Sequence, residues 1–250
     1  MTAEPSTRRA ARSRAVAATV GVMVAVAVLG RYGPPHTMLV AGPAGAVLLL
    51  LLARSAGLGA DDVGLGRRSW RRGAAYAAAC VGAVALVYAV AALVPATRQA
   101  FLDERYRDGL GAALLTAFVV VPLGTILFEE VAFRGVLWGL LCLASGPTRA
   151  TLVSSGLFGL WHVLPSLRLN RVNPAVADLV GAGRAGQVLA VVGAVVFTAM
   201  AGALLCELRR RSGSLLAPIG LHWAVNGLGV LVAAAVAGSG WAAGPGWKGW

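Results

Sequence analysis

The chain has 250 residues, of which 58% are hydrophobic, and its mean hydropathy is +0.76. Charged residues make up 13%, against roughly a quarter in an ordinary soluble domain. A soluble domain of this length could not bury so much apolar surface, so the composition excludes both a soluble globular enzyme and a disordered chain. The net charge of +12 comes almost wholly from arginines placed between apolar runs, which indicates anchors of membrane helices and no nucleic-acid partner.

Stretches without Asp, Glu, Lys or Arg mark the candidate membrane helices. They cover residues 15–30, 32–53, 73–97, 109–128, 135–148, 150–167, 185–206 and 212–247. A spanning helix needs about 20 apolar residues, and five of these stretches reach that length. They predict an all-α fold, a polytopic membrane bundle of about seven to eight transmembrane helices that packs against the lipid bilayer.

We expect four regions in chain order: a basic cytoplasmic tail, N-terminal transmembrane helices, a second helix bundle and a Trp-rich C-terminal tail. Their ranges are 1–14, 15–97, 105–237 and 238–250. In the second bundle, residues 110–143 read as one long tilted helix, and a return helix begins at Arg149.

The arginines orient this bundle. With seven helices and the N-terminus inside, 13 basic residues fall on the cytoplasmic side and 8 on the other, as the positive-inside rule expects. The first group is Arg8, Arg9, Arg12, Arg14, Arg54, Arg67, Arg68, Arg71, Arg72, Arg149, Arg209, Arg210 and Arg211; the second is Arg31, Arg98, Arg105, Arg107, Arg168, Arg171, Arg184 and Lys248. The arginine-rich, lysine-poor composition suggests a GC-rich bacterial genome, and therefore a multi-pass protein of the bacterial plasma membrane.

Three charged residues stand where a membrane helix should have none. Glu129, Glu130 and Arg134 all fall within the long helix 110–143, and each such group costs about 2.5–3.5 kcal/mol at a helix centre. Glu130 and Arg134 are four residues apart, so they share a face and can pair. Adjacent residues point about 100° apart, so Glu129 faces another helix. One acid is therefore expected to be a structural anion, and the other is free to react.

Two histidines and an asparagine fall within later apolar runs. His162 follows Phe158 by four residues, and His222 precedes Asn226 by four, which places each pair on one helix face. Counted from the predicted cytoplasmic helix ends, Glu129, His162 and His222 all lie about 16–21 Å deep. Each group alone also fits a structural role, but three polar clusters at one depth indicate a functional site.

These groups support peptide hydrolysis in two ways. Glu129 acts as a general base on water, with His162 positioning the water and with His222 and Asn226 donating to the oxyanion. Alternatively, Glu129, His162 and His222 bind zinc, which activates the water. The sequence has no HExxH motif, so no cofactor is certain and both mechanisms stay open. Serine chemistry fits poorly, because Ser239 lies outside any nucleophile turn, and no paired intramembrane Asp supports an aspartyl mechanism.

The motifs resemble a known family. Glu129-Glu130-x-x-x-Arg134, Phe158-x-x-x-His162 and His222-x-x-x-Asn226, in this order on successive membrane helices, resemble the CPBP family. This family contains the CAAX prenyl proteases and bacteriocin-processing relatives, also called Abi proteins. The resemblance covers about residues 105–235. It implies an all-helical intramembrane endopeptidase whose site opens to the cytoplasm, with a glutamate or a metallo mechanism and with Glu130 and Arg134 supporting the site.

Bacteria generally lack protein prenylation, so we expect a membrane-associated protein or peptide as the substrate. Two other functions stay open. One is a non-proteolytic membrane immunity or binding protein. The other is a proton-coupled transporter that uses Glu129 and His162 as a relay, although no inverted repeat of broken helices is visible.

Overall fold

The computed structural model describes residues 6–101 and 109–238. The expected C-terminal tail at 239–250, the loop residues 102–108 and the first five residues lie outside the described part of the chain. The described part is helical throughout and contains no strand. Its helices are α1 (Ser6–Tyr32), α2 (Met38–Ser55), η1 (Arg67–Ser69), α3 (Trp70–Leu93), α4 (Pro95–Arg98), η2 (Gln99–Phe101), α5 (Leu110–Leu115), η4 (Thr116–Val120), η5 (Pro122–Ile126), α6 (Leu127–Glu129), η6 (Glu130–Leu137), α7 (Trp138–Trp161), α8 (Val163–Ser166), α9 (Leu169–Val172), α10 (Pro174–Val180), α11 (Arg184–Ser212), α12 (Leu216–Trp223), η7 (Ala224–Leu228) and α13 (Gly229–Gly238).

Within the described residues, six helical stretches are long and apolar enough to cross a membrane, so the protein is an integral multi-pass membrane protein. The longest stretch runs from Leu110 to Ser166. It breaks at Gly146, whose φ of 80° and ψ of 168° are not helical. One hydrogen bond joins the two arms on either side of this break: the indole Nε1–H of Trp138 donates to Oγ1 of Thr151 at 3.1 Å. The stretch is therefore a helical hairpin. Its two arms raise the number of membrane-crossing helices in the described part of the chain from six to the seven that the sequence predicts.

Two boundaries differ from the expectation. The first helix begins at Ser6, inside the segment that was expected to be a tail. The return arm begins right after Gly146 rather than at Arg149, because a glycine adopts a positive φ without the steric penalty that other residues meet.

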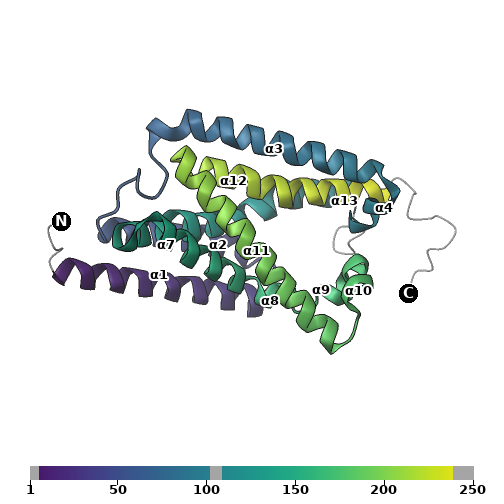
Figure 1. Ribbon diagram of the computed structural model, residues 1–250, viewed down its shortest axis with the longest axis horizontal. Coiled ribbons are helices and arrows are strands. Elements are labelled where there is room, and N and C mark those ends of the chain that lie inside the picture. The colour runs from purple at the N-terminus through teal and green to yellow at the C-terminus, as the bar shows by residue number, and fades with distance from the viewer. Residues whose placement is uncertain (1–5, 102–108, 239–250) are drawn as a thin grey trace.

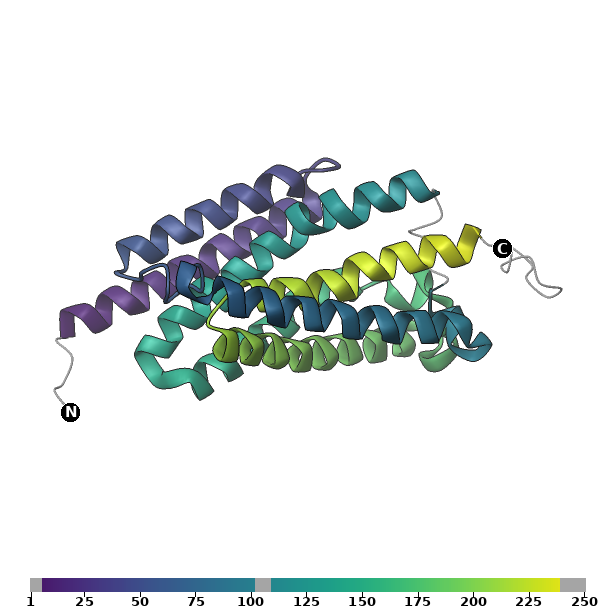
Figure 2. The same cartoon turned by 90° about the horizontal axis from the view of Figure 1, so that it is seen from above.

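The helices form two groups around the hairpin (Figure 1). Helices α1 and α2 lie side by side along one flank, whereas α3 runs along α12 and α13 on the opposite flank, as the view from above also shows (Figure 2). Helix α11 crosses between them and packs most extensively on α7. A Cβ on Gly159 of α7 would lie 2.7 Å from the carbonyl oxygen of Val195, so only glycine permits this close crossing.

Three segments of the hairpin's first arm and one segment of the last long helix wind as π-helix. They are η4, η5, η6 and η7. A π-helix bonds residue i to i+5 and is frequent at functional sites. All six polar residues singled out in the sequence lie on or beside these segments and on the end of α7.

Candidate active site

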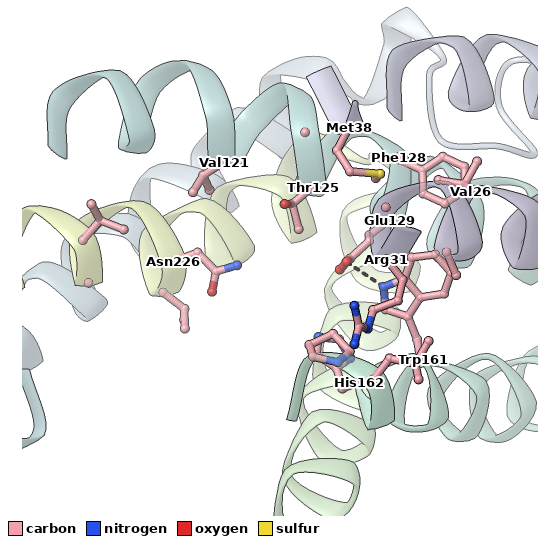
Figure 3. Close-up of a pocket in the computed structure, with 18 of the residues that line it drawn as sticks. Val26, Arg31, Met38, Val121, Thr125, Phe128, Glu129, Trp161, His162 and Asn226 are labelled. Atoms are coloured by element: carbon pink, nitrogen blue, oxygen red, sulfur yellow. Dashed lines mark hydrogen bonds between the residues drawn. The ribbon is translucent and has the colours of Figure 1, made fainter. Parts of the chain in front are cut away.

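Glu129 ends α6 in the middle of the hairpin's first arm. Its side chain is 7% exposed, and it lines a cavity of about 840 Å³. The indole Nε1–H of Trp161 donates to its Oε1 at 2.8 Å, the dashed line in Figure 3. Oε2 is buried and accepts no hydrogen bond from any of the described residues. One carboxylate oxygen is thus held by Trp161, and the other has no donor among the described residues.

Glu130, the next residue, lies in a different environment. It is fully buried and does not line the cavity. Its Oε1 accepts hydrogen bonds from Arg134 Nη1 at 3.1 Å and from His222 Nδ1 at 2.7 Å. The predicted Glu130–Arg134 ion pair is confirmed, and the pair also reaches across to α12. Phe158 adds to it, since the Arg134 guanidinium carbon lies 3.9 Å from the ring centroid.

His222 is oriented by Glu130 rather than facing the cavity. A carboxylate oxygen accepts, so Nδ1 of His222 carries the hydrogen of that bond. Its Nε2 then faces Glu129, with 3.8 Å between this nitrogen and Oε2. The π-helical segment η7 begins between His222 and Asn226, and of these two residues only Asn226 lines the cavity.

His162 follows the last residue of α7 and lines the cavity. Its Nδ1 lies 2.8 Å from the carbonyl oxygen of Phe158, one turn earlier. A carbonyl can only accept, so Nδ1 is the protonated nitrogen and Nε2 is the open one. The Phe158 ring packs edge-on against the imidazole, with 4.6 Å between the centroids, and this contact fixes the ring plane.

Figure 3 shows Glu129, Trp161, His162 and Arg31 on one side of the cavity and Asn226 on the opposite wall. The remaining lining is largely apolar and includes Val26, Met38, Val121 and Phe128.

The three residues expected as zinc ligands do not fit a metal. Among the described residues, no group of three His, Cys, Asp or Glu side chains is placed to hold a metal ion. Each histidine uses its Nδ1, one on Phe158 and the other on Glu130, and keeps its Nε2 open, as a metal-binding histidine also does.

Sequence reasoning missed Trp161 and Arg31. Trp161 precedes His162, and a tryptophan beside an intramembrane histidine is a signal, since its N–H needs a partner when it is buried. Arg31 ends α1 and was counted only as a topological charge; its place in the cavity depends on the packing of α1 against the hairpin.

One comparison with known proteins gave a match. A family model described as type II CAAX prenyl endopeptidase Rce1-like matches residues 111–228. The matched segment begins in α5, ends with η7 and contains all six of the predicted site residues. No curated protein and no solved structure gave a significant match.

Proposed function

We propose that this chain, whose residues 111–228 match the family model of Rce1-like type II CAAX prenyl endopeptidases, is an intramembrane endopeptidase in which Glu129 activates water. The observation that carries the proposal is the position of Glu129, which, unlike Glu130, lines the cavity while one of its oxygens is held. Its Oε1 accepts from Trp161 at 2.8 Å, and its buried Oε2 accepts from none of the described residues.

In the proposed reaction, a water molecule attacks the carbonyl carbon of the scissile peptide bond, and the carboxylate of Glu129, which lines the cavity, takes its proton. His162 accepts a hydrogen bond from the same water through Nε2, because its Nδ1–H already donates to Phe158. Asn226, from the other wall, donates its amide N–H to the developing oxyanion. Glu129 then returns the proton to the leaving amine, so the C–N bond breaks and the base is restored.

Glu130, Arg134 and His222 are positioning residues in this mechanism. Glu130 is an anion neutralised by Arg134, and it orients the imidazole of His222 toward Glu129. They hold the reactive carboxylate in place and do not contact the substrate.

The proposed substrate is a peptide or a membrane-associated protein segment in the plasma membrane of a bacterium. The apolar wall suits its side chains, and Arg31 supplies a cation near the catalytic groups. A guanidinium attracts carboxylates, so we assign to Arg31 the binding of a carboxylate on the substrate, such as a free C-terminus.

The test compares new peptide termini in membranes that contain wild type, Glu129→Gln or Glu207→Gln. Glu207 is a matched control, because it is a partly exposed acid paired with Arg210 and Arg211 on α11. Cleavage should persist in wild type and in Glu207→Gln. It should fall about 10²- to 10⁴-fold in Glu129→Gln, the usual contribution of a general base.

Identical peptide termini in all three membranes, with all three proteins folded, would overturn the proposed protease activity. That result would favour a non-proteolytic membrane-binding protein. A chelator series completes the test. Cleavage should survive the chelator, and a loss that zinc restores would replace the glutamate mechanism with a metallo mechanism.

A further inference from the structure

The cavity that holds Glu129 lies toward one end of the bundle. Its lining includes the last turn of α1, the first residue of α2, the end of α3 with η2, and the first half of α8. One lining residue from each of these four places, in the same order, is Arg31, Met38, Phe101 and Leu164. All are helix termini that meet at the same end, where α1 turns into α2 and where α7 turns toward α11.

Toward the other end, the same arm is closed. Every residue from 128 to 140 is buried, and Phe133, Val136, Leu137 and Leu140 have no exposed surface. Leu215, 1% exposed, adds to this layer, and its backbone N–H donates to the carbonyl oxygen of Gly64 in the connection after α2. No water or peptide can pass such a layer without unpacking it, so Glu129 is reached from the cavity end.

The two ends differ in charge. The closed end carries the arginine clusters: the start of α1, Arg54 in the last turn of α2, the start of α3, and Arg209 to Arg211 at the end of α11. The arginines toward the cavity end are fewer and more scattered: Arg31, Arg98, Arg168, Arg171 and Arg184. Arginines collect on the cytoplasmic side of membrane proteins, and anionic lipids strengthen this preference. The closed end is therefore cytoplasmic, and the cavity faces the opposite side.

We propose that the catalytic cavity opens to the non-cytoplasmic side of the membrane, so that its substrates are exported peptides or the outer segments of membrane proteins. The part of this inference that names substrates rests on the proposed function. The direction in which the cavity opens rests on packing and charge alone. It reverses the cytoplasmic opening that the family resemblance implies.

The experiment measures access from each side with single cysteines in the full-length chain. Cys80, Cys142 and Cys206 are free thiols and are first replaced by Ala. Three positions are then tested: Ala100→Cys at the cavity rim, Thr125→Cys inside the cavity, and Ala60→Cys at the arginine-rich end. The probe is a charged, membrane-impermeant methanethiosulfonate, which needs no catalytic activity.

In right-side-out vesicles, Ala100→Cys and Thr125→Cys should react at least tenfold faster than Ala60→Cys, and inverted vesicles should reverse this order. Reaction of Thr125→Cys only in inverted vesicles would overturn the proposal. Equal rates from both sides at Thr125→Cys would also overturn it, because the buried layer would then not be closed.

A second measurement uses the wild-type chain, in case the cysteine replacements disturb folding. Trypsin added to intact vesicles should cut at Arg67 and Arg68, in the exposed connection before α3, only when the vesicles are inverted. Cutting there from the outside overturns the orientation. Loss of cleavage activity in Glu129→Gln leaves both measurements unchanged, so the proposed function and the proposed direction fail separately.

Discussion

Glu129 and Glu130 are neighbours in the chain, but they belong to two regions with opposite physical character. The region before Glu129 lines a cavity, and there the packing leaves room for a peptide. The region after it, residues 130–140, is buried without exception. Each acid keeps one buried oxygen without a donor among the described residues. Only Glu129 lines the cavity, whereas Oε1 of Glu130 accepts from both an arginine and a histidine.

The difference teaches how one helix can hold both a reactive and a structural anion. The reactive one must border a cavity that water and a substrate can enter, as Glu129 does. The structural one needs charge compensation, because an unpaired ion in a dry layer is strongly unfavourable. A shift of one residue along the helix exchanges these environments.

The largest effect should come from breaking the buried layer. Glu130→Gln removes the negative charge and leaves Arg134, which has no exposed surface, as an uncompensated cation. Losing one partner of a buried pair costs about 3–5 kcal/mol, so the unfolding midpoint in detergent should fall sharply. Glu207→Gln should leave that midpoint unchanged. Equal midpoints for the two variants would show that Glu130 is not a structural anion.

Next in size is the loss of the tryptophan that holds the reactive acid. Trp161→Phe removes the N–H donated to Glu129 and keeps the ring contacts. Hydrogen bonds to charged groups contribute about 1.5–3 kcal/mol, so kcat should fall roughly 10- to 100-fold at nearly constant KM. Trp138→Phe is the matched control, because its indole donates to Thr151, outside the cavity lining. A similar fall in kcat for both variants would make the effect of Trp161 merely structural.

A smaller effect is expected where α7 crosses α11. A Cβ at Gly159 would meet the carbonyl oxygen of Val195 at 2.7 Å, so Gly159→Ala should destabilise the bundle by about 1–3 kcal/mol. On the same helix, a Cβ at Gly156 meets nothing within 4 Å. Gly156→Ala should therefore be neutral or slightly stabilising. Thermal unfolding of the two variants tests the crossing, and a stable Gly159→Ala protein would contradict it.

The smallest effect should appear at the cavity rim. Arg31 is exposed, and exposed ion pairs contribute little, so Arg31→Gln should raise KM about two- to fivefold for substrates with a free carboxylate. Amidated substrates should show no change. Arg168→Gln, at the same end but outside the cavity lining, should leave KM unchanged for both. An equal rise in KM for amidated and free peptides would show that Arg31 does not bind a carboxylate of the substrate.

Much of this arrangement could be predicted from local patterns. Hydropathy predicted the spanning helices, since the bilayer imposes a length on each of them. The i,i+4 spacing of Glu130 and Arg134 predicted their ion pair. Counting depth from the helix ends placed Glu129, His162 and His222 at one level. Glu129 and His162 line one cavity, and His222 lies beside it with its Nε2 3.8 Å from Glu129 Oε2. Their catalytic roles stay predictions.

The rest depends on geometry that spacing alone does not specify. The π turns in η6 and η7 change which face a residue presents. His222 contacts Glu130 and does not line the cavity that Asn226 lines. The break at Gly146 needed its positive φ, which one glycine among 33 does not signal. The bond from Trp161 to Glu129 requires knowing where α7 ends. The features that the sequence did not predict depend on the rotation of a helix or on where a helix ends. The features that it predicted depend on the spacing of residues along the chain.

Helix α1 lies outside the family match, yet Val26 and Arg31 on it form part of the cavity wall. The groups proposed for bond cleavage and part of the surface that would touch the substrate are thus encoded in separate stretches of the gene. A mutation in α1 can alter which peptides enter without touching the machinery that cuts them. Chimeras that exchange α1 between relatives would then be a direct way to redirect the enzyme.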